Sequence, residues 1–283
     1  MKCYKAIILL FGALLCACGS EKQGVNFYDY NVIAHACGGI DGYTYTDSLE
    51  ALNQSYEKGD RLFDIDLRFS SDGEIVLRHE WQQDLEQPEF DYLMNTESYV
   101  DEYQVGQIVR EQLPTLKQFK NTLIFSKYTP LSFRDVVNWM RKHSDAYMVL
   151  DVKEDPKETY TWIVEHFKED EEILNHLVLS CYDSQDLKAV LGIYPFKNYM
   201  LRQYVNNPDK FDEIISDCNE YHIKAVSVDL KYKTDEKIQD IRNNGIKIYW
   251  AVENDLEEYK REYLGDGVVS DWITENQIKI INK

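Results

Sequence analysis

Two histidines and two aspartates stand at the ends of short apolar runs, and their types suit proton transfer and cation binding. His35 ends one run, Asp64 and Asp66 end a second, and His79 follows a third. A buried strand delivers polar residues at its end, so these segments can bring two imidazoles and two carboxylates to one rim. The pattern predicts acid–base chemistry beside a divalent cation.

Asp64 and Asp66 alternate along their run and therefore share one face of the expected strand. Two neighbouring carboxylates repel each other unless a cation or a proton lies between them. A hard divalent cation fits their oxygen atoms. The alternative is that one of them caps the next helix or pairs with Arg61 or Arg68.

Asp151 and Lys153 repeat this spacing further along the chain. Asp151 would complete the metal shell, and Lys153 would bind a phosphate oxygen as a point charge. A structural salt bridge at a strand end is the alternative.

The imidazoles of His35 and His79 are the predicted general acid and base, because one can take a proton while the other gives one at neutral pH. The remaining histidines fall in helical or edge positions and are predicted to be surface residues: His143, His166, His176 and His222.

Two further residues are candidates with open alternatives. Asp47 and Glu50 have the spacing of a helix capping box, but Glu50 could instead turn its carboxylate to the cation. Trp250 ends an apolar run, where it is either core or a flat wall for an organic substrate group.

These residues must be positioned by a regular alternation of strands and helices. The expected strands are Val32–Ala36, Leu62–Leu67, Ala146–Val152, Leu177–Cys181, Tyr199–Gln203, Ala225–Asp229, Lys247–Val252 and Gly267–Ser270. The expected helices are Ser48–Lys58, Ser132–Lys142, Lys157–Lys168, Ser184–Leu191, Asp209–Tyr221, Asp235–Asn243 and Leu256–Tyr263.

Nearly apolar strands separated by helices indicate a parallel sheet covered on its outer face. Eight such units predict an α/β fold that closes into a TIM (β/α)8 barrel, with the active site at the C-terminal ends of the strands. Residues 81–130 interrupt the alternation after the second strand and a short extra strand, Glu74–Arg78. This long interval is predicted to be a cap-like insertion over the barrel mouth.

The composition excludes one class of partner. The chain has 31 basic and 50 acidic residues and a net charge of −19. Nucleic-acid binding requires clustered lysine and arginine, so no nucleic-acid partner is expected.

The first residues have the layout of a bacterial lipoprotein signal. Two lysines precede an apolar run, and Leu15-Cys16-Ala17-Cys18 resembles a lipobox. We expect residues 1–17 to be removed, Cys18 to be lipidated, residues 18–30 to form a tether, and 31–283 to form the barrel. The expected location is the bacterial cell envelope, on the periplasmic or cell-surface side of a membrane. Cys37, Cys181 and Cys218 show neither a disulfide framework nor a zinc spacing, so buried thiols are expected, with one pair such as Cys37–Cys181 as the alternative.

The motifs together resemble the glycerophosphodiester phosphodiesterase family, within the superfamily of phosphatidylinositol-specific phospholipase C. The matching segments, in order, are Ile33-Ala34-His35, Phe63–Leu67 through Ser71-Asp72-Gly73, His79-Glu80, Leu150–Lys153, Tyr249–Val252 and Ser270–Thr274. The resemblance implies a TIM barrel, acid–base catalysis by His35 and His79, and Ca²⁺ or Mg²⁺ bound by Asp64, Asp66 and Asp151. It also implies that Lys153 contacts phosphate.

The chain departs from the family pattern at several positions. Ala36 stands where the family has an arginine that grips phosphate, and Thr46-Asp47-Ser48 replaces a glutamate-asparagine-threonine triplet. Asp64 and Asp151 replace glutamates and are one methylene shorter. Glu50 or Asp47 is the expected substitute ligand.

The leading hypothesis is a metal-dependent phosphodiester hydrolase that acts on glycerophosphodiesters or on related phospholipid or surface-glycan phosphodiesters. One alternative is a ligand-binding lipoprotein that has kept the barrel and lost turnover. Another is a phospholipase C-like lyase that releases a cyclic phosphate.

Overall fold

A closed ring of eight parallel strands forms the centre of the molecule. The structure is a computed structural model that describes residues 25–81, 110, 113–203 and 210–282. The ring consists of β1 (Val32–Ala34), β2 (Leu62–Phe69), β4 (Tyr147–Val152), β5 (Leu177–Cys181), β6 (Asn198–Gln203), β7 (Ala225–Asp229), β8 (Lys247–Ala251) and β9 (Gly267–Ser270). Pairing of β1 with both β9 and β2 closes it, and β3 (Ile75–Leu77) lies antiparallel to β2 outside the ring. The predicted TIM barrel is confirmed.

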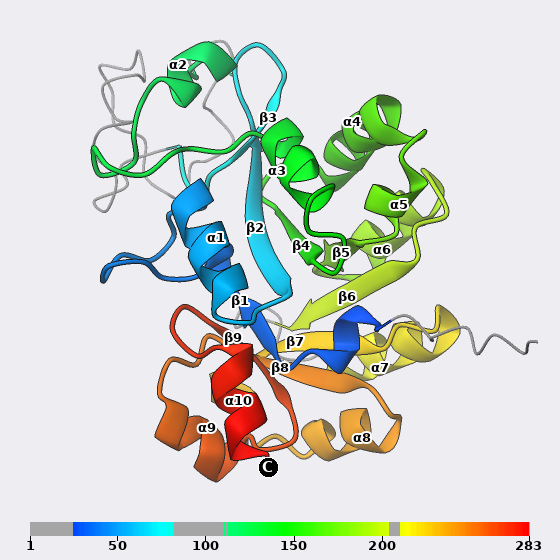
Figure 1. Cartoon of the computed structure of the whole chain (residues 1–283). Coiled ribbons are helices and arrows are strands. Elements are labelled where there is room, and N and C mark those ends of the chain that lie inside the picture. Colours follow the sequence, from blue (N-terminus) through cyan, green and yellow to red (C-terminus); the bar gives the residue numbers. More distant parts are fainter. Residues whose placement is uncertain (1–24, 82–109, 111–112, 204–209, 283) are drawn as a thin grey trace, which may run out of the picture.

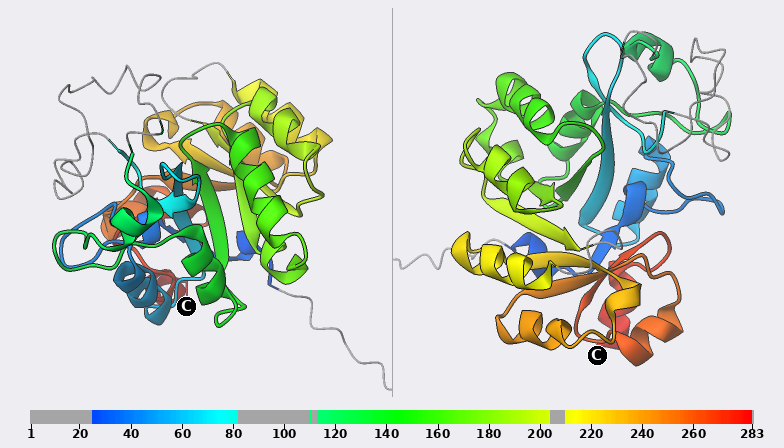
Figure 2. Two further views of the ribbon diagram at one scale, coloured as in Figure 1. Left: turned by 90° about the horizontal axis from the view of Figure 1, so that it is seen from above. Right: turned by 180° about the vertical axis from the view of Figure 1, so that it is seen from behind.

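Helices surround this ring (Figure 1), and views from above and behind show the same arrangement (Figure 2). They are α1 (Leu49–Glu57), α2 (Leu116–Lys120), α3 (Phe133–Met140), α4 (Pro156–Phe167), α5 (Glu171–Leu174), α6 (Ser184–Leu191), α7 (Phe211–Glu220), α8 (Lys237–Asn243), α9 (Leu256–Glu262) and α10 (Glu275–Ile281). Side-chain caps explain where several begin: Ser132, Asp155, Asp183 and Asp255 each accept a hydrogen bond from a backbone N–H of the first turn.

Two apolar layers fill the molecule, one inside the ring and one between the ring and the helices. Val149 and Met200 point inward, whereas Leu150 and Leu201 pack against the helices. Side chains two residues apart on a strand share a face, so this alternation also sends Asp151 inward, two residues after Val149. Phe27, in a short 3₁₀ turn, packs into the inner layer and against Tyr147 near the N-terminal end of the ring.

Some predicted features fall outside the described residues. These are the signal segment, the lipidation site at Cys18, the first part of the tether and most of the 81–130 insertion. Within the described part, no helix is long and apolar enough to cross a membrane. The thiols of Cys37, Cys181 and Cys218 are buried and unpaired, as the sequence predicted.

Candidate active site

His35 follows directly on β1 and begins a tight turn. The next three residues, Ala36, Cys37 and Gly38, have positive φ angles of 44°, 70° and 91°. The first two of these positions are strained, because side chains disfavour the left-handed region. The turn carries the chain away from the strand axis and leaves the His35 imidazole at the C-terminal end of the barrel.

The turn depends on glycine at position 38. A Cβ there would lie 2.2 Å from Ser55 Oγ, which is buried and donates a hydrogen bond to Cys37 O. We therefore expect Gly38→Ala to destabilise the fold by more than the roughly 1–2 kcal/mol that a left-handed alanine costs. Gly42→Ala is the matched control, since φ is +88° there and nothing lies within 4 Å of the Cβ position. Urea denaturation of both variants checks this, and equal losses would contradict the predicted clash.

Asp271, just after β9, orients the His35 ring. His35 Nδ1 and Asp271 Oδ1 are 2.9 Å apart, and Asn254 Nδ2 donates to Asp271 Oδ2 at 2.7 Å. Burial lowers the pKa of His35, but the hydrogen bond to Asp271 and the nearby charge of Asp64 outweigh it, so the pKa lies above 6.5. The contact with Asp271 therefore favours the protonated form of His35.

His79 has an equivalent carboxylate partner. Its Nδ1 lies 3.2 Å from Glu80 Oε1, and its side chain is 34% exposed. Arg68 fixes this segment, because its Nε donates to His79 O at 2.7 Å and its Nη2 lies 3.3 Å from Glu80 Oε2. Both predicted catalytic histidines are thus held by a carboxylate at Nδ1, which leaves Nε2 of each ring for a substrate.

One tyrosine ring contacts both histidines. The Tyr45 ring centroid lies 4.5 Å from that of His35 and 4.9 Å from that of His79, with edge-to-face geometry in both cases. The structure therefore brings the two imidazoles to one place, where both contact the same aromatic ring.

The three predicted metal-binding aspartates converge, but they converge on cationic side chains. Arg202 Nη2 lies 2.6 Å from Asp64 Oδ1, and Arg202 Nη1 lies 3.2 Å from Asp151 Oδ2. Lys153 Nζ lies 3.0 Å from Asp66 Oδ1 and 2.9 Å from Asp151 Oδ2. All three aspartates and Arg202 are buried. The centre of the site is therefore a network of three carboxylates and two cations.

This network sets the charge states of its members. Burial raises the pKa of Asp151, but the charges of Arg202 and Lys153 outweigh it and the net shift is downward. Burial lowers the pKa of Lys153, yet Asp66 and Asp151 raise it well above its usual value. Asp151 and Lys153 are therefore both charged at neutral pH. Tyr182 completes the network by donating to Asp151 Oδ1 at 2.6 Å.

Asp47 is a fourth carboxyl group beside Asp66. Its Oδ1 accepts from the Asp66 backbone N at 3.3 Å, whereas Asp47 Oδ2 and Asp66 Oδ2 are buried and have no hydrogen-bond partner within the described residues. Burial, and then the charge of Asp66, raise the pKa of Asp47 well above its usual value. The buried position of Asp47 beside Asp66 thus favours the protonated form of its carboxyl group.

The predicted ligand set does not fit a resident Ca²⁺ or Mg²⁺ ion. Asp64 and Asp151 already bind the Arg202 guanidinium, and Lys153 bridges Asp66 and Asp151. Within the part of the chain that the structure describes, no group of three or more His, Cys, Asp or Glu residues is arranged to hold a metal ion. The predicted cation stays a prediction.

Glu50 is not part of the site, contrary to its prediction as a metal ligand. Its two carboxylate oxygens accept hydrogen bonds from the backbone N and the hydroxyl of Thr129, at 2.7 and 2.8 Å. Ser48 rather than Asp47 caps α1, by accepting from Ala51 N. Glu50 therefore ties helix α1 to the segment before α3.

Trp250 does not line the site either, and of the two alternatives that the sequence left open, core residue or substrate wall, the structure has the core residue. It is only 1% exposed and belongs to the layer between the ring and the helices. Its Nε1 donates to Asp266 Oδ2 at 2.9 Å, and its ring packs against Tyr263. The reason is its position on β8, where odd-numbered neighbours such as Tyr249 face the barrel interior.

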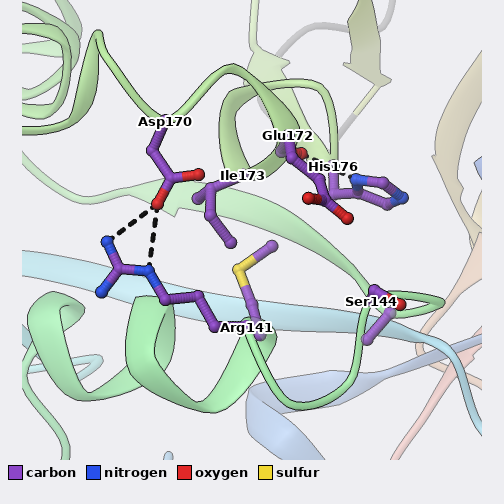
Figure 3. Close-up of a pocket in the computed structure, with 8 residues that line it drawn as sticks. Arg141, Ser144, Asp170, Glu172, Ile173 and His176 are labelled. Atoms are coloured by element: carbon purple, nitrogen blue, oxygen red, sulfur yellow. Dashed lines mark hydrogen bonds and ion pairs between the residues drawn. The ribbon is translucent and has the colours of Figure 1, made fainter.

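A small pocket near the N-terminal ends of β4 and β5 lies away from this site (Figure 3). Arg141 and Asp170 face each other across it and form an ion pair of 2.8 Å. The aspartates and histidines described above lie at the opposite ends of the strands, so the pocket carries none of the candidate chemistry.

Comparisons with known proteins find similarity in structure alone. No protein-family model and no curated protein matches the chain. A solved glycerophosphodiester phosphodiesterase from Thermotoga maritima is 20% identical, with a TM-score of 0.60, over 90% of this chain and 98% of that one. A glycerophosphoryl diester phosphodiesterase from Parabacteroides distasonis is 16% identical, with a TM-score of 0.63, over 89% and 86% of the two chains.

A third solved structure, an Oleispira antarctica phosphodiesterase, is in complex with its product sn-glycerol-3-phosphate. It is 17% identical, with a TM-score of 0.62, over 89% of this chain and 97% of that one. The chain therefore has the TIM-barrel fold of the solved glycerophosphodiester phosphodiesterases.

Proposed function

We propose that this protein hydrolyses phosphodiesters of the glycerophosphodiester class, with His35 as general acid and His79 as general base. One observation carries the proposal: each imidazole is held at Nδ1 by its own carboxylate, and both rings contact Tyr45. A phosphodiester needs one group to take the proton of the attacking oxygen and another to protonate the leaving oxygen. Two oriented imidazoles at one site can do both.

The raised pKa of His35 assigns the roles. Because His35 keeps its proton as the pH passes 6.5, it can give that proton to the leaving alkoxide. His79 is more exposed and can take the proton of an attacking water. Lys153, whose side chain is 15% exposed beside Asp66, would bind a phosphoryl oxygen.

The structural neighbours support this substrate class. The proteins with this fold that are named above are phosphodiesterases, and one binds sn-glycerol-3-phosphate as its product. Sequence identities this low support a shared fold but do not identify the alcohol that leaves. The proposal therefore includes lipid and surface-glycan phosphodiesters. Anchoring to a membrane through Cys18 stays a prediction from the sequence.

A product assay tests the proposal. The purified chain is incubated with glycerophosphocholine and glycerophosphoethanolamine, and phosphorus NMR identifies the products. Release of glycerol phosphate supports hydrolysis, and accumulation of a cyclic phosphate identifies the lyase. Binding measured by calorimetry without any product would replace both with the binding-protein alternative.

The pH profile tests the role of Asp271 as a positioning residue. Asp271→Asn removes the charge that raises the pKa of His35, so the alkaline limb of kcat/KM is expected to move to lower pH. Asp170→Asn, which breaks a surface ion pair with Arg141, is the control and should leave the limb in place. An unmoved limb in Asp271→Asn would remove His35 as the general acid.

The pair of His35 and Asp271 also makes the stability of the fold depend on pH. Because the pKa of His35 in the folded protein exceeds the ordinary histidine value of 6.5, its contribution to stability is full below pH 6.5 and is lost as the pH rises through the folded pKa.

A further inference from the structure

We propose that Arg202 and Lys153 take the place of a divalent cation, so that this site works without a bound metal ion. The part of this proposal that concerns catalysis rests on the function proposed above. The part that concerns metal binding does not, because it can be measured on the protein alone.

The Arg202 guanidinium occupies the position between two carboxylates from different strands. It comes from β6 and reaches Asp64 on β2 at 2.6 Å and Asp151 on β4 at 3.2 Å, while its Nε donates to Ser180 Oγ on β5 at 2.9 Å. The side chain is 3% exposed. A planar fork of donors suits this bridging role, and its charge is permanent.

Lys153 carries the second positive charge. Its ammonium lies within 3.0 Å of Asp66 and Asp151, so Asp151 Oδ2 faces both cations. A divalent ion that used Asp64 and Asp151 would have to displace a buried guanidinium and leave it without its partners. Such an unpaired buried charge is strongly unfavourable.

The alternative, in which a metal ion does bind at this site, names specific ligands and can be tested. Asp47 Oδ2 and Asp66 Oδ2 are the buried carboxylate oxygens that have no hydrogen-bond partner within the described residues. If a metal ion binds here, these two oxygens are its first ligands, and Asp47→Asn would abolish its binding.

The deciding experiment is a metal titration of the full chain after dialysis against EDTA. Calorimetry with CaCl₂, MgCl₂ and MnCl₂ is expected to show no stoichiometric binding, and millimolar cation should shift Tm by less than about 2 °C. One bound cation per chain, lost in Asp47→Asn, would overturn the proposal.

Two variants at position 202 sharpen this test. Arg202→Met removes the charge at similar length and is expected to create cation binding, seen as a new calorimetric signal and a cation-dependent rise in Tm. Arg202→Lys keeps a positive charge and is the matched control. It should show no calorimetric cation binding and no cation-dependent change in Tm. If neither variant folds, the wild-type titration still decides.

Activity gives an independent readout. Wild-type turnover is expected to be equal, within about twofold, in EDTA and in added cation. Turnover that is lost in EDTA and restored by Ca²⁺ or Mg²⁺ would overturn the metal-free proposal but keep the phosphodiesterase. Absence of turnover under both conditions would count against the proposed function, and the titration would still settle metal binding.

Discussion

His35→Ala is expected to lower kcat/KM for glycerophosphodiester hydrolysis by about 10²- to 10⁴-fold, because a positioned general acid contributes that much to the rate. Without the imidazole the leaving alkoxide must take its proton from water. His35 is 9% exposed and its Nδ1 is held by Asp271 at 2.9 Å. A neighbouring side chain is therefore not expected to take over its role in the variant. Release of glycerol phosphate by the purified variant provides the measurement.

Two other histidines serve as comparisons, one in the site and one outside it. His79→Ala should cause a loss of the same order, since its ring serves the other proton transfer. His166→Ala should leave turnover unchanged, because His166 lies on α4, where its Nδ1 hydrogen bonds with Trp162 O. Wild-type rates in both His35→Ala and His79→Ala would exclude imidazole acid–base catalysis, whereas an equal loss in His166→Ala would point to general misfolding.

Much of the barrel could be predicted because its strands coincide with short apolar segments of the sequence. Leu177–Cys181, Ala225–Asp229 and Gly267–Ser270 match β5, β7 and β9 in both bounds. β2 extends two residues further than expected, to Phe69, where it pairs with β3. Helix α10 (Glu275–Ile281) was missed because only a short stretch of chain remains after the last strand. Its Glu275 is buried and accepts hydrogen bonds from the backbone N of Asn31 and Val32 across the chain.

The sequence predicted that polar residues would lie together at the ends of the strands. It did not predict which of these residues would form hydrogen bonds or ion pairs with each other. His35 and Asp271 are 236 residues apart in the sequence, and Asp64 and Arg202 are 138 apart. Such contacts depend on barrel closure and register, which no local pattern encodes. One signal was present and not used: an arginine within the apolar run Tyr199–Gln203, on the same face as Met200, can only point into the barrel.

Side-chain direction also explains why Trp250 and Glu50 do not reach the site. Trp250 and Glu50 lie close in sequence to rim residues, yet neither turns toward the rim. Trp250 is one residue out of phase with the inward face of β8, and Glu50 has Thr129 as a nearer partner. Rim position is therefore a weaker predictor of function than the alternation of side chains along a strand, which correctly put Asp64 and Asp66 on one face.

Arg202→Met is expected to destabilise the fold by about 3–5 kcal/mol when measured in EDTA, because it leaves Asp64 and part of Asp151 as buried charges without their partner. Arg141→Met is the matched control. Arg141 also pairs with an aspartate, at 2.8 Å from Asp170, but its side chain is 49% exposed, so a loss of about 0–1 kcal/mol is expected.

Urea denaturation of both variants gives the comparison. Adding Asp64→Asn to Arg202→Met should recover part of the loss, since the neutral amide removes one of the two unpaired charges. The recovery distinguishes an electrostatic role of Arg202 from a purely packing role, for which the second substitution would add to the loss. A cost below about 1 kcal/mol for Arg202→Met would mean that the aspartates find water or another cation, and the buried guanidinium would then not be what holds β2, β4 and β6 together at the site.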